Sequence, residues 1–351
     1  MSQLFKGIRD LRIQRVRARS EKLVTNNRHR EAIDLLQSAN KRIHSPEIEK
    51  YLVDLRHEAF FHESFSSQFP NWPPTISDRF KTTDHIPEIT TDQMSSDIVR
   101  DGVFSKGSII IRGLLGNDDV VKIREGIELT YQNHDLSRTG YSKEQTAPWF
   151  VPFEPTQRHP DQVLNRDWYR DGGAELAADS PRGLFNLLEC LERNGIIDLV
   201  TGYLGERPAL SVRKTSLRRI PHDLNADNGW HQDGAFLGKG IRTMNLWIAL
   251  TDCGVDAPSM DMVPHRLQNI VPTGTEGAAF EWSVSSKIIE EVCDGEAPTH
   301  LHFKAGDAII FDEMNLHRTS TRPGMTKSRF AVEAWFFAPS CYPIEQLPIL
   351  I

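Results

Sequence analysis

The sequence has few cysteines, and none of them are close together. Four are spread over 351 residues, with no CxxC pair that would mark a zinc or redox motif. We therefore expect neither a disulfide framework nor a structural zinc site. We expect reduced, mostly buried thiols at Cys190, Cys253, Cys293 and Cys341.

Long hydrophobic runs and an excess of basic charge are also missing. No apolar stretch approaches the roughly 18 residues that a membrane-spanning helix needs, and the first residues lack the apolar centre of a secretory signal. The net charge is −7 at pH 7, so the chain as a whole lacks the basic character of nucleic-acid-binding proteins. We expect a soluble cytoplasmic protein with no membrane span and no nucleic-acid partner.

Composition along the chain predicts three parts. Residues 1–65 are rich in Arg, Lys, Glu and Leu with helical spacing of apolar residues, and Ser45-Pro46 is typical of a helix start. We expect three helices in this N-terminal appendage, a polar connector at 66–85 and one large domain at 86–351. A lone helical hairpin cannot bury its own apolar face. The appendage is thus expected to pack on the large domain or to join copies of the chain into a homo-oligomer.

The first predicted helix is basic, with seven Lys and Arg residues between positions 6 and 22 facing two acidic residues, Asp10 and Glu21. This pattern fits contact with an acidic partner, a membrane surface or nucleic acid. A solvated helix face explains it more simply, because a single basic helix on an acidic protein is common.

The second half of the chain is dominated by short β-type runs. A β run at 105–115 and helices at 117–134 and 181–204 come first, the former helix with a cap at Asn117 or Asp118. From about residue 208 onward, strand-like segments alternate with Gly, Pro, Asn and Asp turns. This spacing favours an antiparallel sandwich or barrel, supported from outside by the helices.

A possible metal site begins at His231 and Asp233. Residues two apart on an extended strand point to the same face, so an imidazole and a carboxylate would converge there. Such a pair alone is common by chance. Gln232, between them, is expected to point away from the metal.

A second segment, 86 residues further on, strengthens this interpretation. A Gly306-Asp307 turn leads into an apolar strand and then to His317, and Arg329 opens another apolar strand twelve residues later. Two histidines and one carboxylate form the facial triad of non-haem Fe(II) oxygenases, which leaves three metal positions open. A 2-oxo acid and dioxygen would fill these positions, and an arginine is the best partner for the distal carboxylate of 2-oxoglutarate. In an antiparallel hairpin, Arg329 and His317 would lie near each other.

These segments resemble the phytanoyl-CoA dioxygenase family of Fe(II)/2-oxoglutarate oxygenases. The resemblance covers about residues 208–345, and its motifs are WHQDG at 230–234, NLWIALTD at 245–252, AGDAIIFDEMNLH at 305–317 and SRFAVEAWFFAP at 328–339. It implies a mainly β fold, a double-stranded β-helix (jelly roll) with flanking helices. It also implies that iron is held by His231, Asp233 and His317, and that 2-oxoglutarate is bound by Arg329, assisted by Thr319 and bordered by Trp247.

One family feature is absent, and other polar residues compete for roles. The family's Pro-Gly-Ser-His segment reads Met-Val-Pro-His-Arg-Leu at 262–267, so the substrate is not carried over from the resemblance. His300 and His302 form another i, i+2 pair but lack an evident carboxylate partner, and we expect a structural role. One of the residues Arg213, Lys214, Arg218 and Arg219, expected on a strand before the metal motif, could touch the cosubstrate or an anionic substrate, although a solvated strand face is the simpler interpretation.

The sequence thus predicts a dioxygenase that uses Fe(II), 2-oxoglutarate and O2 to hydroxylate or otherwise oxidise a small organic substrate, with release of succinate and CO2. By the resemblance, the carboxylate at Asp233 favours hydroxylation or desaturation over halogenation. Two alternatives remain open at this point: a cupin-like isomerase or hydrolase with a redox-inert metal, and a non-catalytic binding protein on an oxygenase fold.

Overall fold

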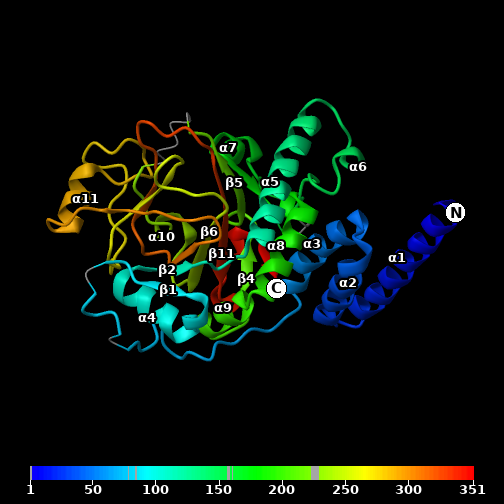
Figure 1. Cartoon of the computed structure of the whole chain (residues 1–351). Helices are drawn as coiled ribbons and strands as arrows, with labels where there is room; N and C mark the ends of the chain where they lie inside the picture. Colours follow the sequence, from blue (N-terminus) through cyan, green and yellow to red (C-terminus); the bar gives the residue numbers. More distant parts are fainter. Residues whose placement is uncertain (1, 78, 84, 156–158, 160, 223–228) are drawn as a thin grey trace.

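The computed structural model describes residues 2–77, 79–83, 85–155, 159, 161–222 and 229–351. Two β-sheets form its centre (Figure 1). Within the described residues the larger sheet contains β1 (Glu88–Thr90), β2 (Ser108–Arg112), β3 (Ala174–Leu176), β4 (Ala209–Ser211), β5 (Ser216–Ile220), β6 (Thr243–Ala249), β9 (Ala308–Phe311), β11 (Arg329–Phe337) and β12 (Pro348–Leu350). The smaller sheet contains β7 (Ser259–Met262), β8 (Thr299–His300) and β10 (His317–Ser320).

The strand order matches the predicted jelly roll. The larger sheet runs β1-β2-β9-β6-β11-β4-β12, with β5 also paired to β11 and β3 to β5, and the smaller sheet runs β10-β7-β8. All pairs are antiparallel except β1 with β2. The fold is therefore a double-stranded β-helix with flanking helices, as the resemblance implied.

Strand β11 shows how residue alternation divides the interior. Phe330, Val332 and Phe336 belong to the apolar core shared with the helices. Ala331 and Trp335, at alternate positions, belong to the core between the two sheets. Because successive side chains of a strand point to opposite faces, every second residue of β11, starting from Arg329, is directed into the jelly roll.

Helices cover the outer face of the larger sheet (Figure 1). They are α4 (Ser96–Lys106), α5 (Asn117–Arg138), α8 (Pro181–Arg193) and α9 (Ile196–Leu204), with the short α6 (Lys143–Thr146), α7 (Arg166–Asp171), α10 (Gly234–Leu237) and α11 (Ser286–Cys293) elsewhere. The helices expected at 117–134 and 181–204 are present, the latter as two. The predicted cap at Asn117 or Asp118 is wrong: the N-cap of α5 is Gly116, and no side chain caps it.

The three predicted N-terminal helices are α1 (Ser2–Thr25), α2 (His29–Ile43) and α3 (Pro46–Phe60). Ser45 accepts a hydrogen bond from the Ile48 amide at 3.4 Å, as its capping position predicts. Helix α3 packs on α8 and β12, whereas α1 lies furthest from the sheets (Figure 1). The His57 ring donates to the Pro348 carbonyl at 2.7 Å. The appendage thus packs on the jelly roll. The domain boundaries at residues 65 and 86 remain predictions. No helix of the described chain is long and apolar enough to span a membrane.

The Gly306-Asp307 turn anchors the strand that leads to the second histidine of the motif. Gly306 has φ +96°, and its amide donates to the Ala249 carbonyl at 2.8 Å. Asp307 accepts from the amides of Gly113 and Lys304 at 2.8 and 2.9 Å. A Cβ atom at residue 306 would lie 2.3 Å from the Leu115 carbonyl oxygen. Both the backbone conformation and the close approach therefore require glycine.

Gly306→Ala should lower the free energy of unfolding by about 3 kcal/mol or more, because it adds a backbone clash to the roughly 1–2 kcal/mol cost of a left-handed conformation. Gly324 is the matched control, since its φ is +91° and open space surrounds its Cβ position. Gly324→Ala should show the conformational cost alone, and urea unfolding of both variants measures the difference. Equal losses would contradict the role given to the contact with Leu115.

Candidate metal centre

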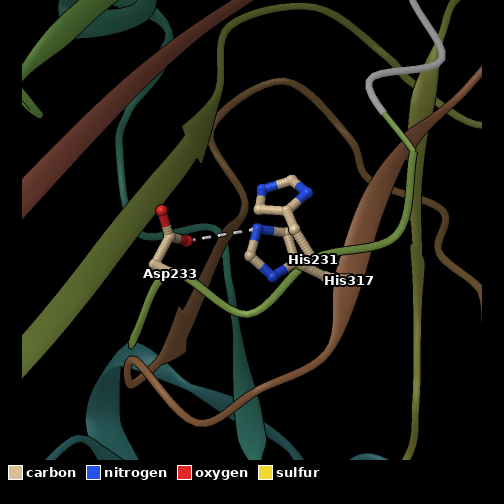
Figure 2. Close-up of side chains that lie close together, drawn as sticks. All are labelled: His231, Asp233 and His317. Carbon is tan, nitrogen blue, oxygen red and sulfur yellow. Dashed lines mark ion pairs between the residues drawn. The ribbon is translucent and has the colours of Figure 1, made fainter. Parts of the chain in front are cut away.

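His231, Asp233 and His317 converge at one point (Figure 2). Their candidate ligand atoms lie within 4.8 Å of one another, and they form the one group of three or more potential metal ligands in the described part of the chain. The three residues therefore lie together in the structure, as the sequence predicted.

The two histidines are held together by their backbones. The His231 amide donates to the His317 carbonyl at 3.0 Å, and the His317 amide donates to the His231 carbonyl at 3.1 Å. This reciprocal pair fixes the segment before α10 against the first residue of β10. The ring centroids of the two imidazoles are consequently 4.5 Å apart.

Asp233 reaches the site from a turn, not from the extended strand that we predicted. Its backbone has φ −62° and ψ −27° at the N-cap of α10, and the next amide, Gly234, donates to the Glu313 carbonyl at 2.9 Å. The buried Gln232 side chain donates to the Met314 carbonyl at 2.8 Å and accepts from the Val271 amide at 2.8 Å. Gln232 therefore points into the surrounding loops and holds the chain reversal between the two candidate ligands.

Each imidazole has one nitrogen engaged by the protein. Nδ1 of His231 lies 3.0 Å from the Gly229 carbonyl, and Nδ1 of His317 lies 3.2 Å from the Asn315 carbonyl. A carbonyl oxygen only accepts, so we assign the proton to Nδ1 in both rings, which leaves Nε2 with a free lone pair. This is the arrangement that metal-binding histidines generally show.

The electrostatics of the three residues suit a divalent cation. Burial, followed by repulsion from His231, lowers the pKa of His317 to about 4, so that ring is neutral at pH 7. Burial alone would raise the pKa of Asp233, but Lys214 and the two histidines outweigh it and lower the value to about 2. The Oδ2 atom of Asp233 is buried and finds no hydrogen-bond partner among the residues that the structure describes. It lies 3.6 Å from Nε2 of His317. A buried carboxylate oxygen without a donor, close to two imidazoles, fits a bound Fe(II) ion.

Arg329, expected to hold 2-oxoglutarate, lies deep between the sheets. Its side chain is 1% exposed, and Nη1 donates to the Ser259 carbonyl on β7 at 2.8 Å. No ion pair to it is found among the described residues, and its Nε has no hydrogen-bond partner. Burial, followed by repulsion from Arg218, lowers its pKa to about 10. A buried guanidinium without a carboxylate is costly, and an anionic ligand would relieve that cost.

The predicted hairpin between His317 and Arg329 is wrong. His317 opens β10 in the smaller sheet, whereas Arg329 opens β11 in the larger one. The two residues are brought toward the same interior space because the sheets face each other, and the Arg329 side chain crosses to β7. A spacing of twelve residues is long enough for the chain to pass from one sheet to the other.

Thr319 and Trp247 also lie between the sheets. Thr319 is two residues after His317 on β10 and therefore on the same face of that strand. Trp247 is buried on β6, and the guanidinium carbon of Arg329 lies 5.5 Å from the centre of its ring. The structure thus places Trp247 beside Arg329. Their cosubstrate roles remain predictions.

The competing candidates have other partners. His300 does have a carboxylate nearby, contrary to our expectation: its Nδ1 lies 2.7 Å from Asp261. That carboxylate is also paired with Arg318 at 2.9 Å and Arg322 at 3.5 Å. His300 therefore belongs to a charged network on the smaller sheet, away from the three converging residues. Arg318 is turned away from the interior, because it alternates with His317 and Thr319.

The contacts that Lys214 and Glu333 make near the site were not predicted from the sequence. Arg213 and Lys214 lie in the turn between β4 and β5 and not on the predicted strand. Lys214 pairs with Asp233 at 2.8 Å. Glu333 is largely buried on β11 and accepts from Arg218 at 2.7 Å and from the Trp335 indole at 3.0 Å. Glu333 lies four residues after Arg329 on the same strand, so alternation directs both side chains inward. This spacing could have indicated Glu333 from the sequence.

Exposed aromatic side chains flank His231 and were likewise not predicted. The ring centroids of Phe236 and Trp282 lie 6.1 and 5.9 Å from that of His231. Phe280 stacks on Trp282 with an interplanar angle of 3°. All three aromatics are 39–47% exposed. They give the His231 side of the site an apolar border open to solvent.

A two-histidine, one-carboxylate cluster inside a jelly roll is the arrangement of the non-haem Fe(II) oxygenases. The sequence model of the phytanoyl-CoA dioxygenase (PhyH) family matches residues 104–324. The chain belongs to this family, and it is an Fe(II)- and 2-oxoglutarate-dependent oxygenase whose second cosubstrate is O2. No curated protein matches the sequence significantly.

Solved structures with a similar fold have low sequence identity to the chain. They include the non-haem alpha-ketoglutarate-dependent carbocyclase SnoK from nogalamycin biosynthesis, with 16% identity and a TM-score of 0.45 over 71% of this chain and 86% of that one. EctD from S. alaskensis, solved with 2-oxoglutarate and 5-hydroxyectoine, has 13% identity and a TM-score of 0.49 over 79% and 83% of the two chains. AviO1 from Streptomyces viridochromogenes has 16% identity and a TM-score of 0.44 over 72% and 98%.

The loop that leads to His317 contains two buried acidic residues. Asp312 pairs with Arg266 at 2.7 Å, and Glu313 accepts a hydrogen bond from the Thr243 hydroxyl. Burial, followed by repulsion from Asp312, raises the pKa of Glu313 to about 8. Glu313 therefore keeps its proton in the folded protein at neutral pH.

This pKa shift predicts a pH-dependent stability. The unfolded chain loses the Glu313 proton near the ordinary pKa of 4.5 and the folded chain near 8, so the contribution is present below pH 4.5 and is lost as the pH rises to 8. Stability should fall by up to about 1.4 kcal/mol per pH unit in this window. Glu313→Gln should remove that slope, as measured by urea unfolding at pH 5.5, 7 and 8.5. Glu290→Gln, at an exposed position of α11, should leave it unchanged. A slope that persists in Glu313→Gln would contradict the assignment.

Proposed function

We propose that the chain hydroxylates, or otherwise oxidises at a C–H bond, a small organic substrate. In this proposal His231, Asp233 and His317 hold the iron, and Arg329 holds the distal carboxylate of 2-oxoglutarate. The observation that carries the proposal is the buried Arg329, which has no anionic partner among the described residues and faces the same interior space as the three candidate ligands. The ligand cluster alone would also suit a redox-inert metal, but such a metal gives no reason to bury an unpaired arginine.

When bound, iron and 2-oxoglutarate supply the oxidation: one atom of O2 goes into succinate as CO2 is released, and the other goes to the substrate. The chain's own residues bind and orient these groups. The carbonyls of Gly229 and Asn315 fix the tautomer and orientation of the two imidazoles. Trp247 supports the Arg329 guanidinium on one side and keeps water from the distal carboxylate.

The same residues prepare the site for a cationic metal. His317 is neutral and Asp233 ionised at pH 7, so no proton has to leave these two residues before metal binds. The substrate is proposed to enter on the His231 side, where Phe236 and Trp282 are exposed. Their rings would bury the apolar part of a substrate and displace water from the metal.

Anaerobic titration of the apoprotein with Fe(II) and then 2-oxoglutarate tests this proposal. We expect the weak visible charge-transfer band of a 2-oxo acid chelated to Fe(II). His231→Ala and Asp233→Ala should abolish the band and iron binding without unfolding the protein. His300→Ala removes a histidine outside the cluster and should retain both. A wild-type protein that binds metal but never shows the band, and consumes no O2 with any 2-oxo acid, would favour a redox-inert enzyme.

Arg329→Met should weaken 2-oxoglutarate binding about a hundredfold, since truncating one member of a buried charge pair costs roughly 2–5 kcal/mol. The dissociation constant is read from the same titration. Arg322→Met is the control, because Arg322 lies between β10 and β11, is 52% exposed and pairs with Asp261 at 3.5 Å. An unchanged dissociation constant in Arg329→Met, or a comparable loss in Arg322→Met, would contradict the assignment of the anchor.

A further inference from the structure

The two oxygens of the Asp233 carboxylate have different surroundings. Oδ1 accepts a hydrogen bond from Nζ of Lys214 at 2.8 Å. Oδ2 is buried, has no hydrogen-bond partner in the described part of the chain and lies 3.6 Å from Nε2 of His317. One oxygen is therefore occupied by a cationic donor. Figure 2 shows the other oxygen facing His317.

Lys214 is held in this position by its local structure. It lies in the tight turn between β4 and β5, where its amide donates to the Ser211 hydroxyl at 3.0 Å. Its ammonium group is 4.2 Å from the centre of the Phe236 ring, and its side chain is 24% exposed. Among the described residues, Asp233 is the one carboxylate paired with it. The turn and the aromatic ring thus direct the lysine at Oδ1.

We infer that Lys214 is a positioning residue that makes Asp233 a one-oxygen ligand. The inference rests on the proposed function, in which Asp233 binds iron. A metal that used both oxygens would approach Oδ1 and come close to the ammonium group, and the two positive charges repel each other. Coordination through Oδ2 alone keeps the metal on the side of the histidines and leaves the hydrogen bond of Lys214 intact.

This restriction matters because the reaction needs three open positions on the metal. Two-point binding of 2-oxoglutarate takes two of them and O2 needs the third. A carboxylate that bound through both oxygens would take one of these positions. Lys214 therefore lowers the metal affinity of the site and keeps one coordination position on the metal open.

Lys214→Met should accordingly produce two opposite effects. Isothermal titration of the metal-free protein with Co(II) should show about tenfold tighter binding, because a repulsive charge is removed and the second oxygen is released. Nitric oxide, used as a probe for the open position, should bind at least about fivefold less to the anaerobic Fe(II)–2-oxoglutarate complex, as measured by its electron paramagnetic resonance signal. General damage to the site would weaken both.

Two further variants serve as controls. Lys214→Arg keeps the positive charge and should retain wild-type behaviour in both measurements. Lys287→Met removes a lysine that pairs with Glu276 at 2.9 Å on the exposed surface of α11 and should also change neither.

Both effects are required in Lys214→Met. Unchanged or weaker Co(II) binding, or an undiminished nitric oxide signal, overturns the inference and indicates that Lys214 leaves Asp233 when metal binds. A wild-type protein that binds neither Co(II) nor Fe(II) would instead contradict the proposed function, and the inference would fall with it.

Discussion

The reciprocal backbone hydrogen bonds between His231 and His317 are the contact on which the candidate site depends. These residues are far apart in the sequence, and the strand that carries His317 is short. Two hydrogen bonds, at 3.0 and 3.1 Å, set the separation of the imidazoles before any metal is present. The carbonyls of Gly229 and Asn315 then set the direction of each ring. The ligand geometry is therefore built largely by the backbone, which preorganises the site for metal.

Charged side chains lie in the interior of the jelly roll, and they differ in how completely other protein groups pair with them. Glu333 accepts hydrogen bonds from Arg218 and Trp335, so the protein itself compensates its charge. Asp233 has one satisfied oxygen, and Arg329 has a single neutral acceptor. Unpaired buried charges lower the stability of the free protein. Their incomplete pairing is understandable if the missing partners are a cation at Asp233 and a carboxylate at Arg329, which is the charge pattern of iron with 2-oxoglutarate.

The sequence predicted those parts of the site that depend on local pattern. The family resemblance singled out Arg329 and Trp247, which lie together between the sheets, and the Gly306-Asp307 turn was recognisable from its residues. The family resemblance supplied the jelly roll itself.

The failures come from contacts between distant segments. The turn at Asp233 depends on hydrogen bonds from Gln232 to the loops near residues 270 and 314. The crossing from β10 to β11 depends on which sheet each strand joins. Lys214 was expected on a strand with a possible role toward an anion, and no local pattern indicates that the turn after Ser211 directs it at Asp233. Such pairings are decided by tertiary packing, which propensity and periodicity do not encode.

The two sides of the site differ in how far they are buried. Around Arg329 the walls are buried, and Trp247 lies beside the guanidinium. Around His231 the border is formed by Phe236, Phe280 and Trp282, which are exposed. The nearby segment 262–267 also departs from the family motif. In the proposed arrangement, a substrate on the His231 side would contact these aromatic rings, while the cosubstrate would lie on the buried side with Arg329. Membership of the family thus gives the cofactors of the chain, whereas the substrate is proposed to contact the aromatic border.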